Sequence, residues 1–336
     1  MANLVRTLTV RLLAFFIACS AAMPASASSP VQANTPSSET QSHSSFQRHY
    51  TATAYITLLS ITIFSRSAVG FGYAGIEERT DGARQSLSLR FLSGSSPERA
   101  HGLNRFGFIQ ENVEQKNRIM VAADYFGLMT ANAEDSFRDA KAALNSTTGA
   151  QVAFVAARAV INQQKTSYSV RHMLLPSSYR GSNADQLLEQ VQAEFAAPLV
   201  GQSEKTETLN GSATSTFLSS LRQAILAAGD AYQSRIVFNG KIFQFHASLH
   251  PDAKTGVELQ RAGLTASPDA ITQLSGVLRN EKTNEISTFR LWFEQGSPNF
   301  LPLRFEFKPK SYLRLVFDED PSAPAQTLTL NRELPE

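Results

Sequence analysis

The chain is poor in cysteine, in net charge and in long apolar runs. Cys19 is the single cysteine among 336 residues, and 31 basic against 29 acidic residues give a formal net charge of +2. A nearly neutral chain has no overall electrostatic attraction to nucleic acid, so we expect no nucleic-acid partner. Its longest early apolar run, residues 12–18, is too short for a membrane-spanning helix. We therefore expect no transmembrane span in the mature chain.

The N-terminus has the pattern of a secretory signal. Basic residues flank the apolar run, and Ala25-x-Ala27 is a small-residue cleavage site. We expect a signal peptide over residues 1–27 and a periplasmic or secreted protein. Cleavage there removes the cysteine, which excludes disulfides and cysteine-ligated metals. The alternative is lipid anchoring through Cys19, because the three residues before it resemble a lipoprotein processing site.

Composition divides the rest of the chain into four segments. Residues 28–49 are Ser, Thr, Gln and Pro with few apolar residues, which predicts a disordered tether. Residues 50–202 are interpreted as a β-rich half with helices, and residues 203–229 as a polar linker and helix. Residues 230–336 are interpreted as an antiparallel β meander. The two halves can also form one domain, and the sequence leaves open whether they share a sheet.

The end of the meander alternates apolar and polar residues over three successive segments. A period of two predicts strands with one buried face and one solvated face. We therefore expect Leu291, Leu303, Phe305 and Leu315 to share the buried face. Glu306, next to Phe305, is expected to be exposed.

These segments carry a family resemblance. Leu-Trp-Phe at residues 291–293 and Leu-Pro-Leu-Arg-Phe-Glu at residues 301–306 are followed by a closing apolar strand. In this order they resemble the end of domain of unknown function 3108, an exported bacterial family. The resemblance is confined to the C-terminal part. It implies a β-rich envelope protein and carries over no catalytic residues.

Other local patterns complete the predicted fold. Residues 55–64 predict a first strand, Ser-Ser-Pro-Glu at 95–98 predicts the start of a short helix, and Asn-Gly at 239–240 predicts a hairpin turn. Residues 150–161 fit a strand or a buried helix equally well. The sequence therefore predicts an α+β, mainly β protein. We expect a strongly curved antiparallel sheet or incomplete β-barrel, partly covered by three or four helices.

Two motifs with possible chemistry favour a structural interpretation. Residues 70–75 spell G-x-G-x-x-G, but the acidic and turn residues that follow predict a strand end and not a cofactor-binding helix. His246 and His250 are four apart in a predicted strand, about 13 Å from each other, which is too far to share a metal. We expect neither a cofactor nor a metal site.

The best polar cluster in the sequence consists of Ser95, Arg99, His101 and Arg105. Backbone amides at a helix start and two guanidinium groups are suitable donors for an anion. The alternative is a capped helix with solvated charges. The chain also has 22 phenylalanines, many of them on predicted strands. Strands lined in this way predict either an apolar cavity inside a curved sheet or plain core packing.

Three functions follow from these patterns. The first is a non-enzymatic envelope protein that binds an apolar or amphipathic, lipid-like ligand inside the sheet, with Arg99 and Arg105 near the mouth. The second is a structural or assembly factor that contacts another envelope protein. The third is a hydrolase built around Ser95 and His101. A large cavity favours the first, a filled core with an apolar surface patch favours the second, and a Ser–His–carboxylate arrangement favours the third.

Overall fold

A single β-sheet forms the body of the protein. The computed structural model describes residues 42–58, 61–96, 98–100, 106–117, 119–130, 152–162, 167–176, 189–191, 193, 204–208, 214–227, 229, 231–238, 241–297, 299–310 and 312–322. The first eight strands are β1 (Ser42–Leu58), β2 (Ile61–Asp81), β3 (Arg84–Ser95), β4 (Phe106–Lys116), β5 (Ile119–Thr130), β6 (Val152–Asn162), β7 (Ser167–Pro176) and β8 (Glu204–Thr208). The remaining strands are β9 (Thr214–Thr216), β10 (Tyr232–Phe238), β11 (Lys241–Pro251), β12 (Ile271–Asn280), β13 (Ile286–Glu294), β14 (Arg304–Lys310) and β15 (Leu313–Glu319).

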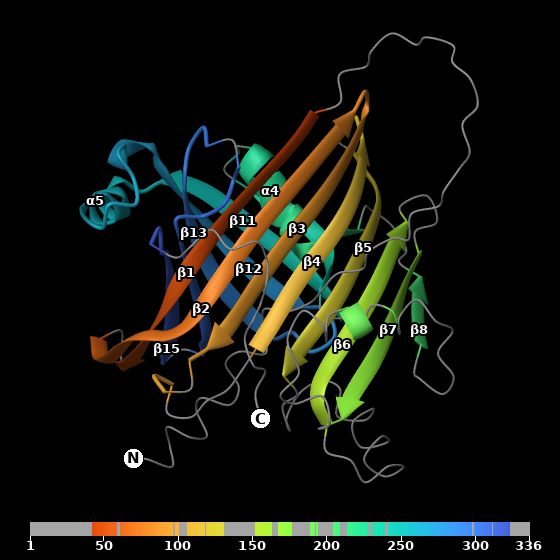
Figure 1. Ribbon diagram of the computed structural model, residues 1–336, viewed down its shortest axis with the longest axis horizontal. Helices are drawn as coiled ribbons and strands as arrows, with labels where there is room; N and C mark the ends of the chain where they lie inside the picture. The colour runs from red at the N-terminus through yellow and green to blue at the C-terminus, as the bar shows by residue number, and fades with distance from the viewer. Residues whose placement is uncertain are drawn as a thin grey trace.

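The strand order follows the chain almost completely. Consecutive strands are neighbours from β1 to β8 and again from β9 to β15, and β1 pairs with β15. The sheet is therefore a ring interrupted between β8 and β9. Every pairing is antiparallel except that of β9 with β10. The blue C-terminal strands pass behind the red-to-yellow N-terminal strands, which shows how strongly the sheet curves (Figure 1).

This architecture confirms the predicted fold class. The protein is mainly β, and its curved sheet is an incomplete barrel with helices against it. Both halves of the chain contribute to the one sheet, which answers the question that the sequence left open. The ambiguous residues 150–161 fall largely in β6, a strand between β5 and β7.

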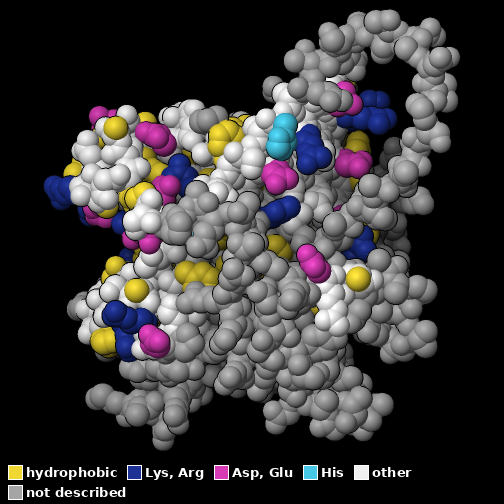
Figure 2. Space-filling view, viewed as in Figure 1, with side chains coloured by type: hydrophobic (Ala, Val, Ile, Leu, Met, Phe, Trp, Pro, Cys, Tyr) yellow, Lys and Arg dark blue, Asp and Glu magenta, His cyan; other side chains and the backbone are white. Residues whose placement is uncertain are grey.

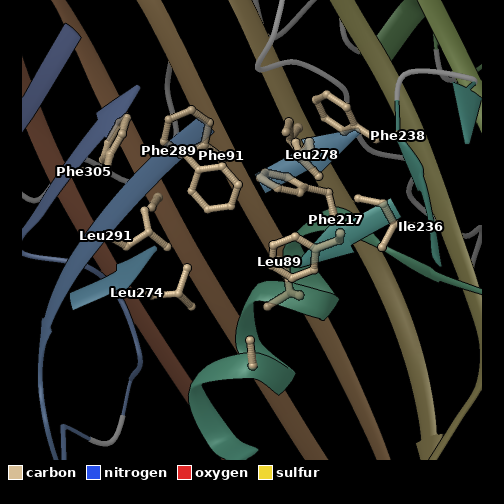
Figure 3. Close-up of a cluster of buried hydrophobic side chains, with 14 of the residues drawn as sticks. Leu89, Phe91, Phe217, Ile236, Phe238, Leu274, Leu278, Phe289, Leu291 and Phe305 are labelled. Atoms are coloured by element: carbon tan, nitrogen blue, oxygen red, sulfur yellow. The ribbon is translucent and has the colours of Figure 1, made fainter. Parts of the chain in front are cut away.

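Helix α4 (Phe217–Ala227) lies against the inner face of the sheet. Phe217 at its start is buried, and its ring is 5.1 Å from that of Phe238 and 5.6 Å from that of Phe289. The close-up shows α4 next to buried side chains that come from both the N-terminal and the C-terminal strands of the sheet (Figure 3). The helix thus fills space that a larger ligand cavity would need.

Helix α5 (Ala253–Arg261) covers part of the outer face. Its Leu259 packs with Ile271, Trp292 and Leu303 in a small buried cluster. The carboxylate of Asp252, which caps α5, also accepts a 2.8 Å hydrogen bond from the indole nitrogen of Trp292. Trp292 and the segment Leu-Pro-Leu-Arg at residues 301–304 therefore meet beneath α5. In this fold their role is structural.

Two local predictions were wrong, and a third is described only in part. Residues 55–64 are not one strand, because β1 ends at Leu58 and β2 begins at Ile61. Of the expected helix after Ser95, the described residues 98–100 form a turn, in which Ala100 N–H donates to the carbonyl of Ser96 at 2.7 Å, and the rest lies outside the described residues. β1 begins at Ser42, inside the segment 28–49 that was expected to be a tether. The predicted turn at 239–240 lies outside the described residues, although the flanking β10 and β11 pair as expected.

The C-terminal meander needs two corrections. Leu291, Phe305 and Leu315 share the main core, whereas Leu303 lies in the cluster beneath α5. Glu306 is buried and not exposed, because it forms ion pairs with several neighbouring cations. Period-two alternation identifies the two faces of a strand, but it does not show that the polar face is covered.

Candidate ligand-binding pocket

A pocket of about 90 Å³ lies between α4 and the inner face of the sheet. It is partly open to solvent, and most of its wall is apolar. The wall includes Ala74 and Leu89 from adjacent strands, Phe289 and Phe305 from the opposite side, and Leu221 from α4. Such a wall fits an apolar group better than a polar substrate.

The pocket depends on the position of α4, and a buried carboxylate holds the start of that helix. Glu111 on β4 accepts hydrogen bonds from the backbone N–H groups of Leu218 and Ser219, both at 2.9 Å. The first N–H groups of a helix have no partner within the helix, and the positive end of the helix dipole favours an anion. Glu111 thus supplies the N-terminal cap of α4 from a strand far away in the sequence.

Burial changes the acidity of this carboxyl. Glu111 is fully buried, and desolvation raises its pKa to about 7. Hydrogen bonds from the start of α4 favour the ionised form and offset only part of that increase. Near neutral pH the capping group therefore exchanges readily between its charged and neutral forms.

Charged residues also line the pocket: Arg90, Glu306 and Arg222, the last of which forms an ion pair with Glu78. The guanidinium of Arg222 on α4 donates to the Glu78 carboxylate at 2.7 Å and lies 5.5 Å from the centre of the Phe300 ring. Burial lowers the pKa of Arg222, and Glu78 opposes this change. The Nε atom of Arg222 is buried and has no hydrogen-bond partner in the described structure.

The size of the pocket limits what it holds. A dry cavity of about 150 Å³ is enough for benzene, and this pocket is smaller, at about 90 Å³. In this conformation it accepts an apolar group of a few carbon atoms. The rest of the interior is filled by α4 and phenylalanine side chains, so core packing accounts for most of the predicted apolar lining.

The predicted polar cluster lies elsewhere. Ser95 is buried at the end of β3, and Arg99 is exposed in the following turn. Neither residue lines the pocket. His101 and Arg105 lie outside the described residues, so an anion site formed by these four residues stays a prediction.

Sequence reasoning missed Glu111, although a signal was present. Ile109, Glu111 and Val113 occupy alternate positions of β4, and all three are buried. A lone acid in an apolar row indicates a carboxylate with a buried partner. Its partner could not be identified, because α4 lies about a hundred residues further along the chain.

No metal-ligating group was found in the part of the chain that the structure describes. No three His, Cys, Asp or Glu side chains gather there in a way that could hold a metal ion. His250 contacts the amide of Gln273. Among the same residues, no helix combines the length and the apolar character that crossing a bilayer requires.

Comparisons with known proteins identify no family. No protein-family model matches the chain, so the resemblance to domain of unknown function 3108 is not confirmed, and no curated protein matches either. Among solved structures, the chain is similar to a β-barrel-like protein of domain of unknown function DUF1849 from Brucella abortus. The TM-score is 0.40 at 9% sequence identity, over 83% of this chain and 95% of that chain.

Proposed function

We propose that this is a non-enzymatic binding protein that holds the apolar end of an amphipathic ligand between α4 and the inner face of the sheet. The observation that supports the proposal is the pocket itself, a mostly apolar wall that also includes the charged residues Arg90, Arg222 and Glu306. An amphipathic molecule matches this arrangement, because its apolar end fits the wall while an acceptor group meets Arg222. The predicted export signal is consistent with a role in the envelope.

The volume sets the expected affinity. Burying a CH₂ group contributes about 0.8 kcal/mol, and four or five such groups contribute roughly 4 kcal/mol, which corresponds to millimolar affinity. A pocket of this size therefore predicts weak binding of short chains. Longer chains gain nothing further while α4 keeps its position.

Titration with straight-chain carboxylates of increasing length, followed by NMR chemical-shift changes, tests the proposal. We expect affinity to rise with chain length and then to level off. The Leu221→Trp variant fills the pocket and should weaken binding about tenfold, the equivalent of 1.4 kcal/mol. Leu226→Trp is the matched control, because Leu226 lies on the same helix, is exposed, and does not line the pocket.

The two results that contradict the proposal are clear. One is an absence of chain-length dependence, and the other is equal weakening by the Leu221→Trp and Leu226→Trp variants. Either result leaves the structural or assembly role as the better explanation of a filled core.

A further inference from the structure

Three cations surround one buried acid on the outer face of the C-terminal meander. The Glu306 carboxylate lies 3.2 Å from Nη1 of Arg314, 3.5 Å from Nζ of Lys308 and 4.0 Å from Nη1 of Arg290. No other acid among the described residues lies at ion-pair distance from these three cations. One negative and three positive charges give this group, the Glu306 cluster, a formal charge of +2.

The strands of the meander hold the cluster in place. Glu306 alternates along β14 with Phe305 and Phe307, which belong to the core, so its side chain leaves the strand on the outer face. Arg290 is directly opposite Glu306 on β13, and Lys308 is two residues further along β14. Both positions share a face with Glu306. The cationic groups therefore project from paired strands toward one point.

The carboxylate does not use all the donors around it. Arg314 on β15 donates a hydrogen bond to Glu306, and its guanidinium lies 4.3 Å from the centre of the Tyr55 ring. The side chains of Arg290 and Lys308 are 48% and 42% exposed, and among the described residues neither forms a side-chain hydrogen bond. Their N–H groups are therefore accessible to a further acceptor.

This excess of positive charge is local. Other ion pairs of the protein join one cation to one acid, as Arg48 with Glu319 and Arg222 with Glu78. On the face shown in Figure 2, dark-blue basic and magenta acidic side chains lie next to each other over most of the coloured surface. The excess at the Glu306 cluster therefore does not follow from the composition of the chain, which is nearly neutral.

The charge of the cluster selects a class of ligand. A phosphate monoester carries a charge of about −1.5 to −2 at neutral pH and offers three strong acceptor oxygens. This charge balances the cluster, whereas a carboxylate or a phosphodiester brings one negative charge. Arginine also binds phosphate through two parallel N–H bonds, which a planar guanidinium supplies without rearrangement.

We propose that Arg290, Lys308 and Arg314, arranged around Glu306, form a binding site for a phosphate monoester group. The site is separate from the pocket beneath α4, because none of the three cations lines that pocket. A free phosphorylated compound and the headgroup of phosphatidic acid present the same chemistry to it.

Titration of the full chain with glycerol 3-phosphate, followed by NMR chemical-shift changes, tests the proposal. The Arg290→Gln/Lys308→Gln variant should bind about tenfold more weakly. Arg84→Gln/Lys116→Gln is the matched control, because these two exposed cations are directly opposite each other on β3 and β4. It removes the same charge and should change the affinity by less than about twofold. All four substitutions are at exposed positions and should leave folding intact.

Two further arms identify the ligand. Dimethyl phosphate, a diester with one charge, should bind about tenfold more weakly than glycerol 3-phosphate. Cosedimentation with phosphatidylcholine vesicles that contain phosphatidic acid distinguishes the sources of the phosphate. Tighter binding to these vesicles than to glycerol 3-phosphate, lost in Arg290→Gln/Lys308→Gln, identifies a lipid headgroup, and binding of glycerol 3-phosphate alone identifies a soluble ligand.

Three results overturn the proposal. The first is an absence of binding to both glycerol 3-phosphate and the vesicles. The second is equal affinity for the monoester and the diester, and the third is equal weakening by the two double-glutamine variants.

Discussion

The Glu111 carboxylate on β4 accepts a 2.9 Å hydrogen bond from the backbone N–H of Ser219, a residue 108 positions further along the chain. This contact joins the N-terminal half of the sheet to the helix inside it. It also places a titratable group where water does not reach. The stability of the protein should therefore depend on pH through this one residue.

Glu111→Gln should reduce that pH dependence. The pKa of Glu111 is raised from 4.5 to about 7, so the folded state binds a proton more tightly than the unfolded state. The resulting stabilisation is complete below about pH 4.5 and is lost as the pH rises through about 7, a change of roughly 3 kcal/mol. Urea unfolding at about pH 5 and pH 8 measures it. Equal pH effects in variant and wild type would show that Glu111 is not the group responsible.

Phe217→Ala should remove the main contact of α4 with the core. Phe217 is fully buried against three phenylalanine rings. Truncating such a side chain costs about 3–5 kcal/mol of unfolding free energy. Leu226→Ala, at an exposed position of the same helix, should change it by under about 0.5 kcal/mol. Similar losses in urea melts of the two variants would mean that α4 does not pack as described.

Glu306→Ala should be destabilising, in contrast to the small effect expected of an exposed residue. Its buried carboxylate lies 3.2 Å from Arg314, 3.5 Å from Lys308 and 4.0 Å from Arg290. The three cations that remain are 31–48% exposed and can be solvated, so the expected loss is that of hydrogen bonds to a charged group, about 1.5–3 kcal/mol at most. Exposed Glu285→Ala is the control, with an expected change under about 0.5 kcal/mol. A neutral Glu306→Ala result in thermal melts would argue that solvent reaches this site.

Gly256→Ala should destabilise the protein although alanine is the better helix former. A Cβ at Gly256 would overlap the carbonyl oxygen of Pro268, which is backbone and cannot move aside as a side chain does. Overpacking of this kind costs about 1–3 kcal/mol, more than the roughly 1 kcal/mol of helix propensity gained. Trp292 fluorescence reports on α5, which packs over it. Lys254→Ala, exposed on the same helix, should show no such loss, and a stabilised Gly256→Ala variant would contradict this packing.

The sequence was sufficient to locate the strands of the meander, although Leu303 and Glu306 needed correction, and it was insufficient for the first hairpin. β13, β14 and β15 alternate in period two and are separated by Gly, Pro and Ser turns, so local chemistry determined them. Residues 55–64 contain no glycine, proline or asparagine at their reversal, and the strand signal continues through it. There the pairing of Ile56 with Phe64 decides where the chain turns, and pairing is a tertiary property.

The candidate site was harder to predict than the fold, because its parts are far apart in the sequence. The pocket combines residues from β2, β3, α4, β13 and β14. Its helix was expected within the segment 203–229, where α4 (Phe217–Ala227) is observed. No local pattern indicates that this helix lies inside the sheet, since a moderately apolar helix fits either face. Contacts with residues far away in the sequence, among them Glu111 and Glu78, fix its position.

The pairing of the first strand with the last has a consequence for the order of synthesis. β1 leaves the ribosome early, but the partner for its second edge is β15, which is made after almost the whole chain. Pairs so distant in sequence close slowly, and an unpaired strand edge favours aggregation. Until β15 has been made, β1 has one edge open to other chains. We therefore expect efficient production of this protein to depend on a chaperone that shields that edge.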